Sequence, residues 1–276
     1  MDAIKIMVNG LPGSMASNVV QHALKDARFE VLPYSLTGPE ITATRCDVAH
    51  QDITLIHPDK KSEAIAGIKN DTPLFVSIDF SHPSAVNPNA EFYCHNGLAF
   101  VMGTTGGDRP LLEETVRASG ISAVIAPNMA KQIVGFQAMV ADASEVFPNL
   151  FEGYTLEIKE SHQKGKADTS GTAKAMVNYF NALGMPFSER DIFKERDPEI
   201  QQKVWGIPQK FLAGHGYHTY TLVSQDQTVK FQFSHNVNGR DVYAQGTLDA
   251  VIYLHQKIAQ DVRGTVFSMI DVLKDT

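Results

Sequence analysis

Cysteine is scarce in this sequence, with Cys46 and Cys94 alone among 276 residues. Because neither belongs to a metal-binding spacing or to a disulfide framework, we expect a reducing compartment. Long apolar runs are also lacking. None approaches the roughly 20 residues of a membrane-spanning helix, and the chain begins in a strand pattern rather than a signal or transit peptide. These absences predict a cytoplasmic protein without a membrane partner, with the plastid as the alternative location if a leader has been removed.

Basic residues are in the minority, since 24 Lys and Arg face 31 Asp and Glu and the formal net charge is -7. This balance argues against a broad surface for nucleic acid, so we expect no nucleic-acid partner. A local basic pocket for a small anionic substrate stays open, because net charge says little about a single cleft. A hydrophobic content of 43% and a charged content of 20% are typical of a globular protein with a buried core.

The first 130 residues alternate between short apolar strands and helical stretches. Continuous apolar runs such as P-L-F-V-S-I-D and G-L-A-F-V-M-G are typical of strands covered on both faces, as in a parallel sheet. Strand and helix in alternation indicate a doubly wound, Rossmann-like α/β domain with a parallel sheet. We expect a helix at residues 14–25 and strands at 4–9, 29–33, 74–79, 98–103 and 123–126.

The pattern changes after a helix predicted at about residues 130–147. Residues 154–160 alternate between apolar and polar, as do the segments on either side of a predicted hairpin turn at 225–228. A further helix is expected at 171–183, and the charged, proline-broken stretch 189–209 is expected to be a surface excursion. This part of the chain is therefore predicted to be an α+β domain with a mixed or antiparallel sheet.

The first predicted strand leads directly into the turn N-G-L-P-G-S-M-A. Gly10 and Gly13 stand where a tight turn needs positive φ and a close backbone approach to phosphate, and the next helix offers free N–H groups. Three other predicted strands also end in polar or Gly-rich turns, at residues 79–83, 103–108 and 126–129. Since ligands bind beyond the carboxyl ends of parallel strands, we predict a dinucleotide site at this edge, to which Asp79 and Phe80 contribute.

The end of the second predicted strand, P-Y-S-L-T-G, lacks the Asp or Glu that usually accepts a hydrogen bond from the ribose 2′-hydroxyl of NAD. Nothing there repels a 2′-phosphate, and Ser35, Thr37 and His82 are placed to assist one, although no Arg is present. We therefore expect NADPH as the favoured cofactor and NADH as an accepted one.

A His and two Lys are crowded into the segment E-S-H-Q-K-G-K-A-D-T-S-G-T-A. We expect a loop that carries His162, Lys164 and Lys166, followed by a helix capped by Ser170 or Thr169. The free N–H groups at the start of that helix and a nearby ammonium form an anion site suited to a carboxylate. An imidazole titrates near neutral pH, and a Lys beside a bound carboxylate can donate a proton. The segment therefore predicts a reductase that acts on a carboxylated substrate.

Five segments in chain order resemble one known family. They are V-N-G-L-P-G-S-M, V-M-G-T-T-G-G-D-R, A-P-N-M-A-K-Q, the segment from Glu160 quoted above, and S-H-N-V-N-G-R-D-V-Y-A-Q-G-T-L-D-A. Together they resemble 4-hydroxy-tetrahydrodipicolinate reductases, the dihydrodipicolinate reductases of lysine biosynthesis, and are most similar to the plant-type branch. The resemblance implies NAD(P)H-dependent reduction of 4-hydroxy-tetrahydrodipicolinate to tetrahydrodipicolinate in lysine and diaminopimelate biosynthesis. It also implies a dinucleotide-binding domain of residues 1–130 with 241–276, around a substrate-binding and oligomerisation domain of residues 131–240.

The resemblance also implies roles for single residues. His162 matches the family's catalytic His and Lys166 its proton-donating Lys, which also binds substrate. The remaining positions expected to bind substrate are Gln163, Ser170, Gly171, Thr172 and Arg240. The cofactor-binding positions carried over are Gly10, Leu11, Pro12, Gly13, Ser14, Met15, Gly103, Thr104, Thr105, Ala126, Pro127, Asn128 and Met129.

The chain departs from the family pattern at several positions. Ala16 replaces the usual Gly, and Gln163 stands where many bacterial members have His. These departures leave two other interpretations open: a reductase of another cyclic imine or enamine carboxylate on the same fold, and a non-catalytic NADPH-binding sensor. The pair of His162 and Lys166 argues against the sensor.

Three further histidines, His215, His218 and His235, are expected mainly in sheet packing or a subunit contact, with His235 the best candidate among them for the pocket. Since no His pair at i, i+4 spacing is present, we predict no metal site. Aromatic residues alternate along the predicted hairpin strands, which suggests a homo-oligomer, either dimer or tetramer. These residues are Tyr217, Tyr220, Phe231 and Phe233.

Overall fold

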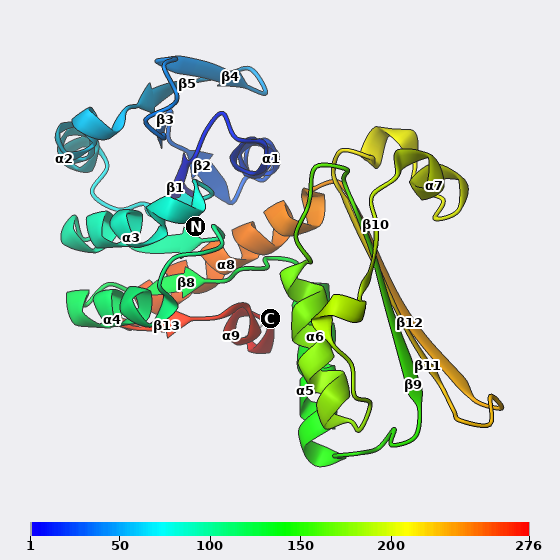
Figure 1. The fold of residues 1–276 in the computed structure, drawn as a ribbon. Helices are drawn as coiled ribbons and strands as arrows, with labels where there is room; N and C mark the ends of the chain where they lie inside the picture. The colour runs from blue at the N-terminus through cyan, green and yellow to red at the C-terminus, as the bar shows by residue number, and fades with distance from the viewer. Residues whose placement is uncertain (1, 276) are drawn as a thin grey trace. The chain divides into compact units, whose positions relative to one another are not determined.

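The computed structural model describes residues 2–275, which divide into two compact units (Figure 1). The N-terminal unit comprises the chain up to Lys131 together with the segment from Asp241 onward, and the central unit comprises Gln132–Arg240. Both boundaries lie within one residue of the expected ones. No helix among the described residues is long and apolar enough to span a membrane.

Six parallel strands form the main sheet of the N-terminal unit: β1 (Ile4–Asn9), β2 (Phe29–Val31), β6 (Val76–Asp79), β7 (Phe100–Met102), β8 (Ala123–Ile125) and β13 (Val266–Phe267). Their order is β13-β8-β7-β6-β1-β2, so the chain progresses in opposite directions on the two sides of β1. Ligands of open α/β sheets bind at the carboxyl edge beside such a reversal. The strands β6, β7 and β8 are buried over their whole length, which explains their continuous apolar runs. The predicted Rossmann-like parallel sheet is confirmed.

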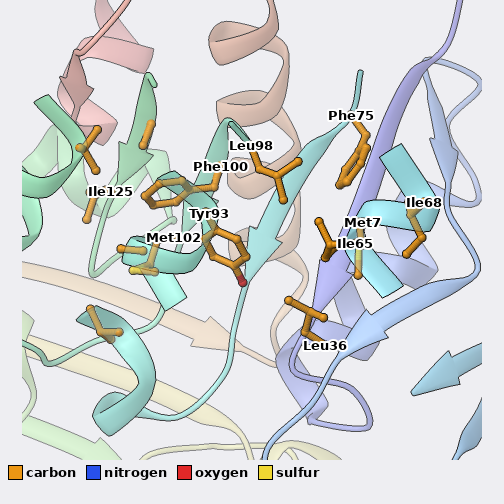
Figure 2. Packing of buried hydrophobic residues seen from close by; sticks show 14 of the residues in the cluster. Met7, Leu36, Ile65, Ile68, Phe75, Tyr93, Leu98, Phe100, Met102 and Ile125 are labelled. Atoms are coloured by element: carbon orange, nitrogen blue, oxygen red, sulfur yellow. The ribbon is translucent and has the colours of Figure 1, made fainter. Parts of the chain in front are cut away.

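Helices cover both faces of this sheet, because the crossovers on the two sides of β1 run in opposite directions. α1 (Ser14–Ala23) contacts α8 (Asp241–Ala259), which also contacts β7 and β8. α3 (Val86–His95) contacts α4 (Arg109–Ser119). Figure 2 shows the core of this unit, in which Tyr93, Phe100 and Met102 have no exposed surface. Two shorter helices, α2 (Lys61–Asp71) and α9 (Met269–Lys274), and the 3-10 turns η1 (Pro58–Lys60) and η2 (Pro83–Ala85) complete the unit.

A second, three-stranded sheet in the N-terminal unit was not predicted. β3 (Tyr34–Leu36) pairs with β5 (Gln51–Ile56), which pairs with β4 (Arg45–Val48). The turn between β4 and β5 consists of Ala49 and His50 in the left-handed region, with φ of 54° and 68°. Glycine or Asn is the usual sign of such a turn, so this pair gave no turn signal.

The central unit contains a four-stranded mixed sheet in the order β10-β9-β11-β12. Its strands are β9 (Thr155–His162), β10 (Phe193–Glu195), β11 (His215–Val223) and β12 (Lys230–Asn238). Only β10 and β9 are parallel. α5 (Lys131–Val146) and α6 (Gly171–Ala182) lie side by side against one face of the sheet (Figure 1), where Phe136 and Phe180 contact Tyr220. The predicted mixed sheet and the hairpin turn at 225–228 are confirmed.

Two expectations for the central unit were wrong. Strand β9 extends to His162 instead of ending at residue 160, so His162 has a strand backbone rather than a loop backbone. The stretch 189–209 is also more than a surface excursion, because it contains β10, α7 (Pro198–Lys203) and the 3-10 turns η3 (Glu189–Asp191) and η4 (Gln209–Phe211). Its polar residues Glu195 and Gln201 are buried. Hydropathy assigns polar residues to the surface, but the Glu195 carboxylate accepts from the Arg196 and Asp197 backbone N–H groups and the Gln201 amide donates to the distant His162 carbonyl oxygen.

Candidate active site

The turn from β1 into α1 fits a pyrophosphate. Gly10 has a φ of +98°, and a Cβ there would lie 2.2 Å from the Phe80 carbonyl oxygen. A Cβ on Gly13 would lie 2.7 Å from the Gly10 carbonyl oxygen, so the turn needs both glycines. No side chain caps α1, and its first turn has no acidic residue. Its first N–H groups therefore stay available to an anion.

Two neighbouring strand ends are joined by the buried carboxylate of Asp79. Its oxygens accept hydrogen bonds from the hydroxyls of Thr104 at 2.6 Å and Tyr93 at 2.7 Å. They also accept from the backbone and hydroxyl of Ser81 and from the Asn89 amide. Asp79 thus connects the loop after β6 to the loop after β7, and its own oxygens are already occupied by these donors.

The other expected cofactor residues lie at the same carboxyl edge of the parallel sheet. A Cβ on Gly103 would lie 2.2 Å from the Phe80 ring, so these two residues form one close contact. The expected residues differ in exposure. Pro12, Gly13, Ser14, Thr105 and Pro127 are exposed, Gly10, Met15, Phe80, Gly103 and Asn128 are intermediate, and Leu11, Asp79, Thr104, Ala126 and Met129 are buried.

The expected contacts to a 2′-phosphate are not supported at two of three residues. Ser35 is fully buried and its hydroxyl accepts from the Leu11 backbone N–H, while the Thr37 hydroxyl donates to the Leu11 carbonyl oxygen. Both hydroxyls therefore hold the glycine turn. His82 stays exposed, with its Nδ1 2.8 Å from the Ser84 hydroxyl.

A carboxylate lies beside this turn after all. The Gly10 N–H donates to the Leu36 carbonyl oxygen, so the residues that follow β3 lie next to the glycine turn. A Cβ on Gly38 would lie 2.4 Å from a Glu40 carboxylate oxygen, which means that Glu40 folds back over Gly38. Glu40 could not be predicted at this place because it stands four residues after the end of β3 rather than at the strand end.

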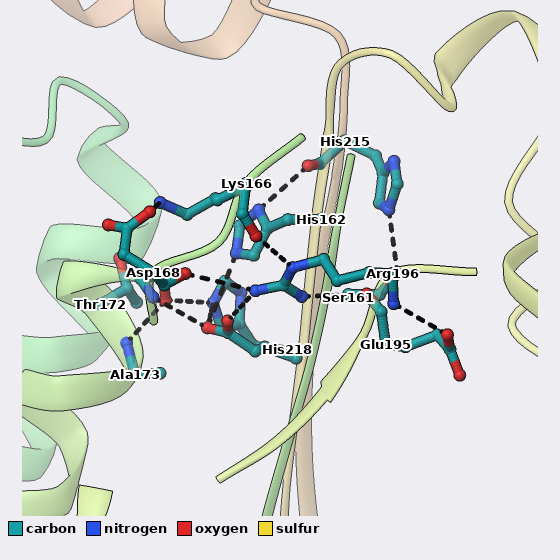
Figure 3. Close-up of polar contacts among 12 residues, drawn as sticks. Ser161, His162, Lys166, Asp168, Thr172, Ala173, Glu195, Arg196, His215 and His218 are labelled. Atoms are coloured by element: carbon teal, nitrogen blue, oxygen red, sulfur yellow. Dashed lines mark hydrogen bonds and ion pairs between the residues drawn. The ribbon is translucent and has the colours of Figure 1, made fainter. Parts of the chain in front are cut away.

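In the central unit, His162 occupies the last position of β9 (Figure 3). Its Nδ1 lies 3.2 Å from the carbonyl oxygen of His215, which can only accept, so Nδ1 carries the proton of this contact. Its Nε2 has no hydrogen-bond partner among the described residues. Strand pairing with β11 fixes the backbone of His162, and Nε2 is buried and lies 3.8 Å from the Glu160 carboxylate.

The start of α6 has a side-chain cap and no acidic residue in its first turn. The Ser170 hydroxyl accepts from the Ala173 N–H at 3.1 Å and is the helix cap, as predicted. The backbone amides of Gly171 and Thr172 lie in a first turn without acidic residues. The Lys166 ammonium lies 2.9 Å from the carboxylate of Asp168, which lowers the pKa of that carboxyl group through this hydrogen bond.

The other two residues expected to bind substrate, Gln163 and Arg240, have fewer contacts with Lys166 and the start of α6. Gln163 is half-buried in the loop after β9, and its carbonyl oxygen accepts from the Lys166 N–H. Arg240 is half-buried with its guanidinium beside Gly214, where a Cβ would lie 3.2 Å from Nη1. Both residues belong to the central unit, as the sequence analysis expected.

Sequence reasoning missed the polar residues that surround His162. Glu160 is fully buried, and its carboxylate lies 2.5 Å from the guanidinium of Arg196. The Gln201 amide donates to the His162 carbonyl oxygen at 2.7 Å. A Glu two residues before a candidate catalytic His on an alternating strand shares its face, and this was the one available signal.

The expected role of two histidines in simple packing was incomplete. His218 lies 2.8 Å from the Ser170 hydroxyl, and its ring contacts that of His162 at 5.1 Å between centroids. His215 binds the Ser161 hydroxyl through Nε2 and receives the His162 contact through its carbonyl. His235 stacks on His218 at 4.6 Å. Register explains the grouping, since Glu160, His218 and His235 are direct cross-strand neighbours.

Burial keeps these imidazoles neutral. It lowers the pKa of His162 to about 4, although the nearby Glu160 charge opposes the shift and the Arg196 and Lys166 charges add to it. Burial also lowers the pKa of His235 to about 4 and that of His218 well below its usual range.

Glu160, His162 and His218 each offer a possible metal-ligand atom, and these atoms lie within 4.8 Å of one another. The Glu160 oxygens, however, already bind the Arg196 guanidinium and the Ser170 backbone N–H. A guanidinium at that distance repels a cation. The geometry therefore favours a polar network here over a metal centre.

Two family models match this chain. "Dihydrodipicolinate reductase, N-terminus" matches residues 4–129, and "Dihydrodipicolinate reductase, C-terminus" matches residues 133–273. The "Probable 4-hydroxy-tetrahydrodipicolinate reductase 1, chloroplastic" of Oryza sativa subsp. japonica is 42% identical over 270 residues, covering 98% of this chain and 78% of the relative. The "4-hydroxy-tetrahydrodipicolinate reductase 2, chloroplastic" of Arabidopsis thaliana is 43% identical over 274 residues, with coverage of 99% and 78%.

Bacterial relatives are less similar. The 4-hydroxy-tetrahydrodipicolinate reductase of Enterococcus faecalis is 34% identical over 223 residues, covering 79% of this chain and 78% of the relative. A solved structure, "Dipicolinate bound Dihydrodipicolinate reductase from Paenisporosarcina sp. TG-14", matches with a TM-score of 0.67 and 16% identity. The match covers 96% of this chain and 97% of that one and shows a shared fold.

The buried histidines predict a pH-dependent stability of the central unit. A folded-state pKa of about 4 against an unfolded value of 6.5 means that the unfolded chain binds more protons in this window, so stability falls as pH drops from 6.5 towards 4. His235 alone should account for a loss of about 2 kcal/mol between pH 7 and pH 5. His235→Gln should remove that share, measured by urea unfolding followed through the single tryptophan, Trp205. His95→Gln, at an exposed helix end, is the control, and an unchanged pH dependence in His235→Gln would contradict the assignment.

Proposed function

Because the chain belongs to the dihydrodipicolinate reductase family, we propose that its N-terminal unit binds the nucleotide and its central unit binds and protonates the substrate. The chain reduces 4-hydroxy-tetrahydrodipicolinate to tetrahydrodipicolinate with NAD(P)H, a step of diaminopimelate and lysine biosynthesis. The prediction of a lysine-pathway reductase is therefore confirmed, and the two alternatives, another cyclic imine reductase and a sensor, give way to it.

The observation that carries the proposed site is the meeting of His162, Lys166 and the start of α6 in one segment of the central unit. One substrate carboxylate is held by the Gly171 and Thr172 amides and the Ser170 cap. Lys166 exchanges Asp168 for a substrate carboxylate and lies close enough to donate a proton. The bound nicotinamide supplies the hydride. The His162 imidazole belongs to the same segment as Lys166, with its Nε2 3.8 Å from the Glu160 carboxylate, and the substrate's negative charge brings the pKa of His162 into a useful range.

Lys166→Ala should lower kcat by about 100-fold or more, the usual contribution of a positioned general acid, while the dissociation constant for NADPH stays unchanged. Lys164→Ala is the matched control, because Lys164 lies in the same loop, is exposed and has no assigned role. Both variants are assayed by NADPH oxidation with the product of the preceding synthase. Retained turnover in Lys166→Ala would remove the assigned role, and absent turnover in the unaltered protein would remove the proposal itself.

The preference between NADPH and NADH depends on the residues beside the glycine turn. The residues thought to favour a 2′-phosphate mostly hold the glycine turn instead, and Glu40 lies over Gly38 beside that turn. A carboxylate near the adenosine ribose accepts from the 2′-hydroxyl of NADH and repels the 2′-phosphate of NADPH. We therefore revise the expected preference for NADPH to acceptance of both cofactors, with Glu40 opposing NADPH.

Glu40→Gln should raise the ratio of kcat/KM for NADPH over NADH by about tenfold, because one unit charge at contact distance from a phosphate costs on the order of 1 kcal/mol in water and more in a cleft. Steady-state kinetics with both cofactors measure the ratio. Glu114→Gln, an exposed position on α4, removes the same charge elsewhere in the unit and should leave the ratio unchanged. A ratio unaffected by Glu40→Gln would show that the acid does not face the ribose.

We also propose a homo-oligomer that forms through β12. This strand is an edge of its sheet, and Phe231 and Phe233 on it remain 40% and 39% exposed. An exposed edge with apolar side chains favours pairing with another copy. The expected contribution of Tyr217 and Tyr220 is wrong, since both are buried within the unit.

Sedimentation velocity should show at least a dimer at micromolar concentration, and Phe231→Lys with Phe233→Lys should shift it towards the monomer. A monomeric unaltered protein would contradict this proposal.

Of the two compartments that the sequence left open, the plastid is supported by the plant relatives, which are named chloroplastic.

A further inference from the structure

The most constrained charge in the central unit is the carboxylate of Glu160. The residue has no exposed surface and lies on β9, two positions before His162. Its Oε1 lies 2.5 Å from Arg196 and its Oε2 accepts from the Ser170 N–H at 3.1 Å. An ionised carboxylate so deeply buried is stable only when charge and hydrogen bonds compensate for lost water, and Arg196 supplies the positive charge.

The guanidinium of Arg196 does more than neutralise Glu160. Its Nε donates to the Lys166 carbonyl oxygen at 2.8 Å, and its Nη2 donates to the Asp168 carbonyl oxygen at 3.4 Å (Figure 3). Its Nη1 donates to the Glu195 carbonyl oxygen at 2.9 Å. The planar fork thus joins three segments: the end of β9, the loop that carries Lys166, and the end of β10.

The loop between β9 and α6 has little else to fix it. The Lys166 N–H donates to the Gln163 carbonyl oxygen within the loop, and Gly165 has open space around it. Among the described residues, the Lys166 ammonium forms an ion pair with the Asp168 carboxylate, which is itself 74% exposed on its side chain. Arg196 is therefore the main contact between this loop and the sheet.

We propose that Arg196 is a positioning residue of the reductase, which with Glu160 holds the 163–169 loop so that the Lys166 ammonium meets the carboxylate bound at the start of α6. The proposal rests on the proposed roles of Lys166 and His162. Arg196 acts through the loop backbone, and the carbonyl groups that it binds belong to Lys166 and Asp168. A lysine at this position could not span Glu160 and the Lys166 carbonyl oxygen together, because its ammonium is a single point.

The charges around His162 give a second test of the role of Arg196, through the pH dependence of kcat. The groups facing it are Glu160 on its own strand, Arg196, Lys166, and His218 with His235 behind it. Removing the Arg196 charge takes away one of the charges that lower the pKa of His162, so the limb of the kcat pH profile that reports His162 should move to higher pH. Glu160→Gln should move it in the opposite direction.

Arg196→Met should lower kcat by about 100-fold, the usual effect of a misplacement near 1 Å in an active site, with unchanged NADPH affinity. Arg196→Lys should recover less than a tenth of the lost rate. In Arg196→Ala, added ethylguanidinium should restore activity in part, which a merely structural defect would not show. Arg190→Met, at an exposed position in the same excursion, is the control and should be unaffected. Circular dichroism and the thermal midpoint confirm that each variant is folded.

The double variant Glu160→Gln with Arg196→Met separates the two functions of the guanidinium. The uncompensated buried charge is gone, so stability should return towards that of the unaltered protein, while kcat should stay low because the loop carbonyls have still lost their donor. A double variant with kcat within threefold of the unaltered enzyme would overturn the proposal, as would an Arg196→Met enzyme with unchanged kcat and pH profile. If Arg196→Met does not fold, kcat of the double variant and of Arg196→Lys tests the same positioning role of Arg196. Failure of the proposed function itself would appear separately, as absent turnover in the unaltered protein, and failure of the role assigned to Lys166 as retained turnover in Lys166→Ala.

Discussion

A carboxylate without access to water lies within the central unit, and the nearby polar groups are arranged around its charge. Glu160 requires a cation and hydrogen-bond donors because burial otherwise makes the ionised form unstable. Arg196 and the Ser170 N–H meet this requirement and tie the excursion after α6 and the cap of α6 to strand β9. Glu160 therefore connects the segments that carry His162, Lys166 and the N-terminus of α6.

The N-terminal unit also contains a buried carboxylate that joins neighbouring loops. Asp79 is equally buried, and the hydroxyls of Tyr93 and Thr104 and the amide of Asn89 converge on it. It joins the loops after β6 and β7, where the close contact between Gly103 and Phe80 also occurs. In each unit, a buried acid holds the loops, and different groups are left free for the ligand. Such supporting contacts are what keep a site within the tolerance that catalysis needs.

Periodicity and motif were sufficient to predict the strands of the main sheet except β13, those of the mixed sheet except β10, the glycine turn and the segment that carries His162 and Lys166, because these depend on local patterns. The partners of Glu160 could not be predicted in this way, since Arg196 is 36 positions away and stands in a stretch that hydropathy assigns to the surface. The strands β3 to β5 were missed because Ala49 and His50 form a turn that normally signals itself by glycine or Asn. Glu40 was missed because only the folded turn brings it over Gly38.

If the proposed substrate site is correct, the Lys166–Asp168 pair changes the energetics of substrate binding. In the free protein the ammonium already has an anionic partner at 2.9 Å, so a dicarboxylate that binds there replaces one anion by another. The net electrostatic gain is the difference between two contacts of similar kind, and the released Asp168 carboxylate returns to solvent. Ionic strength weakens both contacts together, so affinity should depend on salt less steeply than the charges of a lysine, a helix N-terminus and a dianion would suggest.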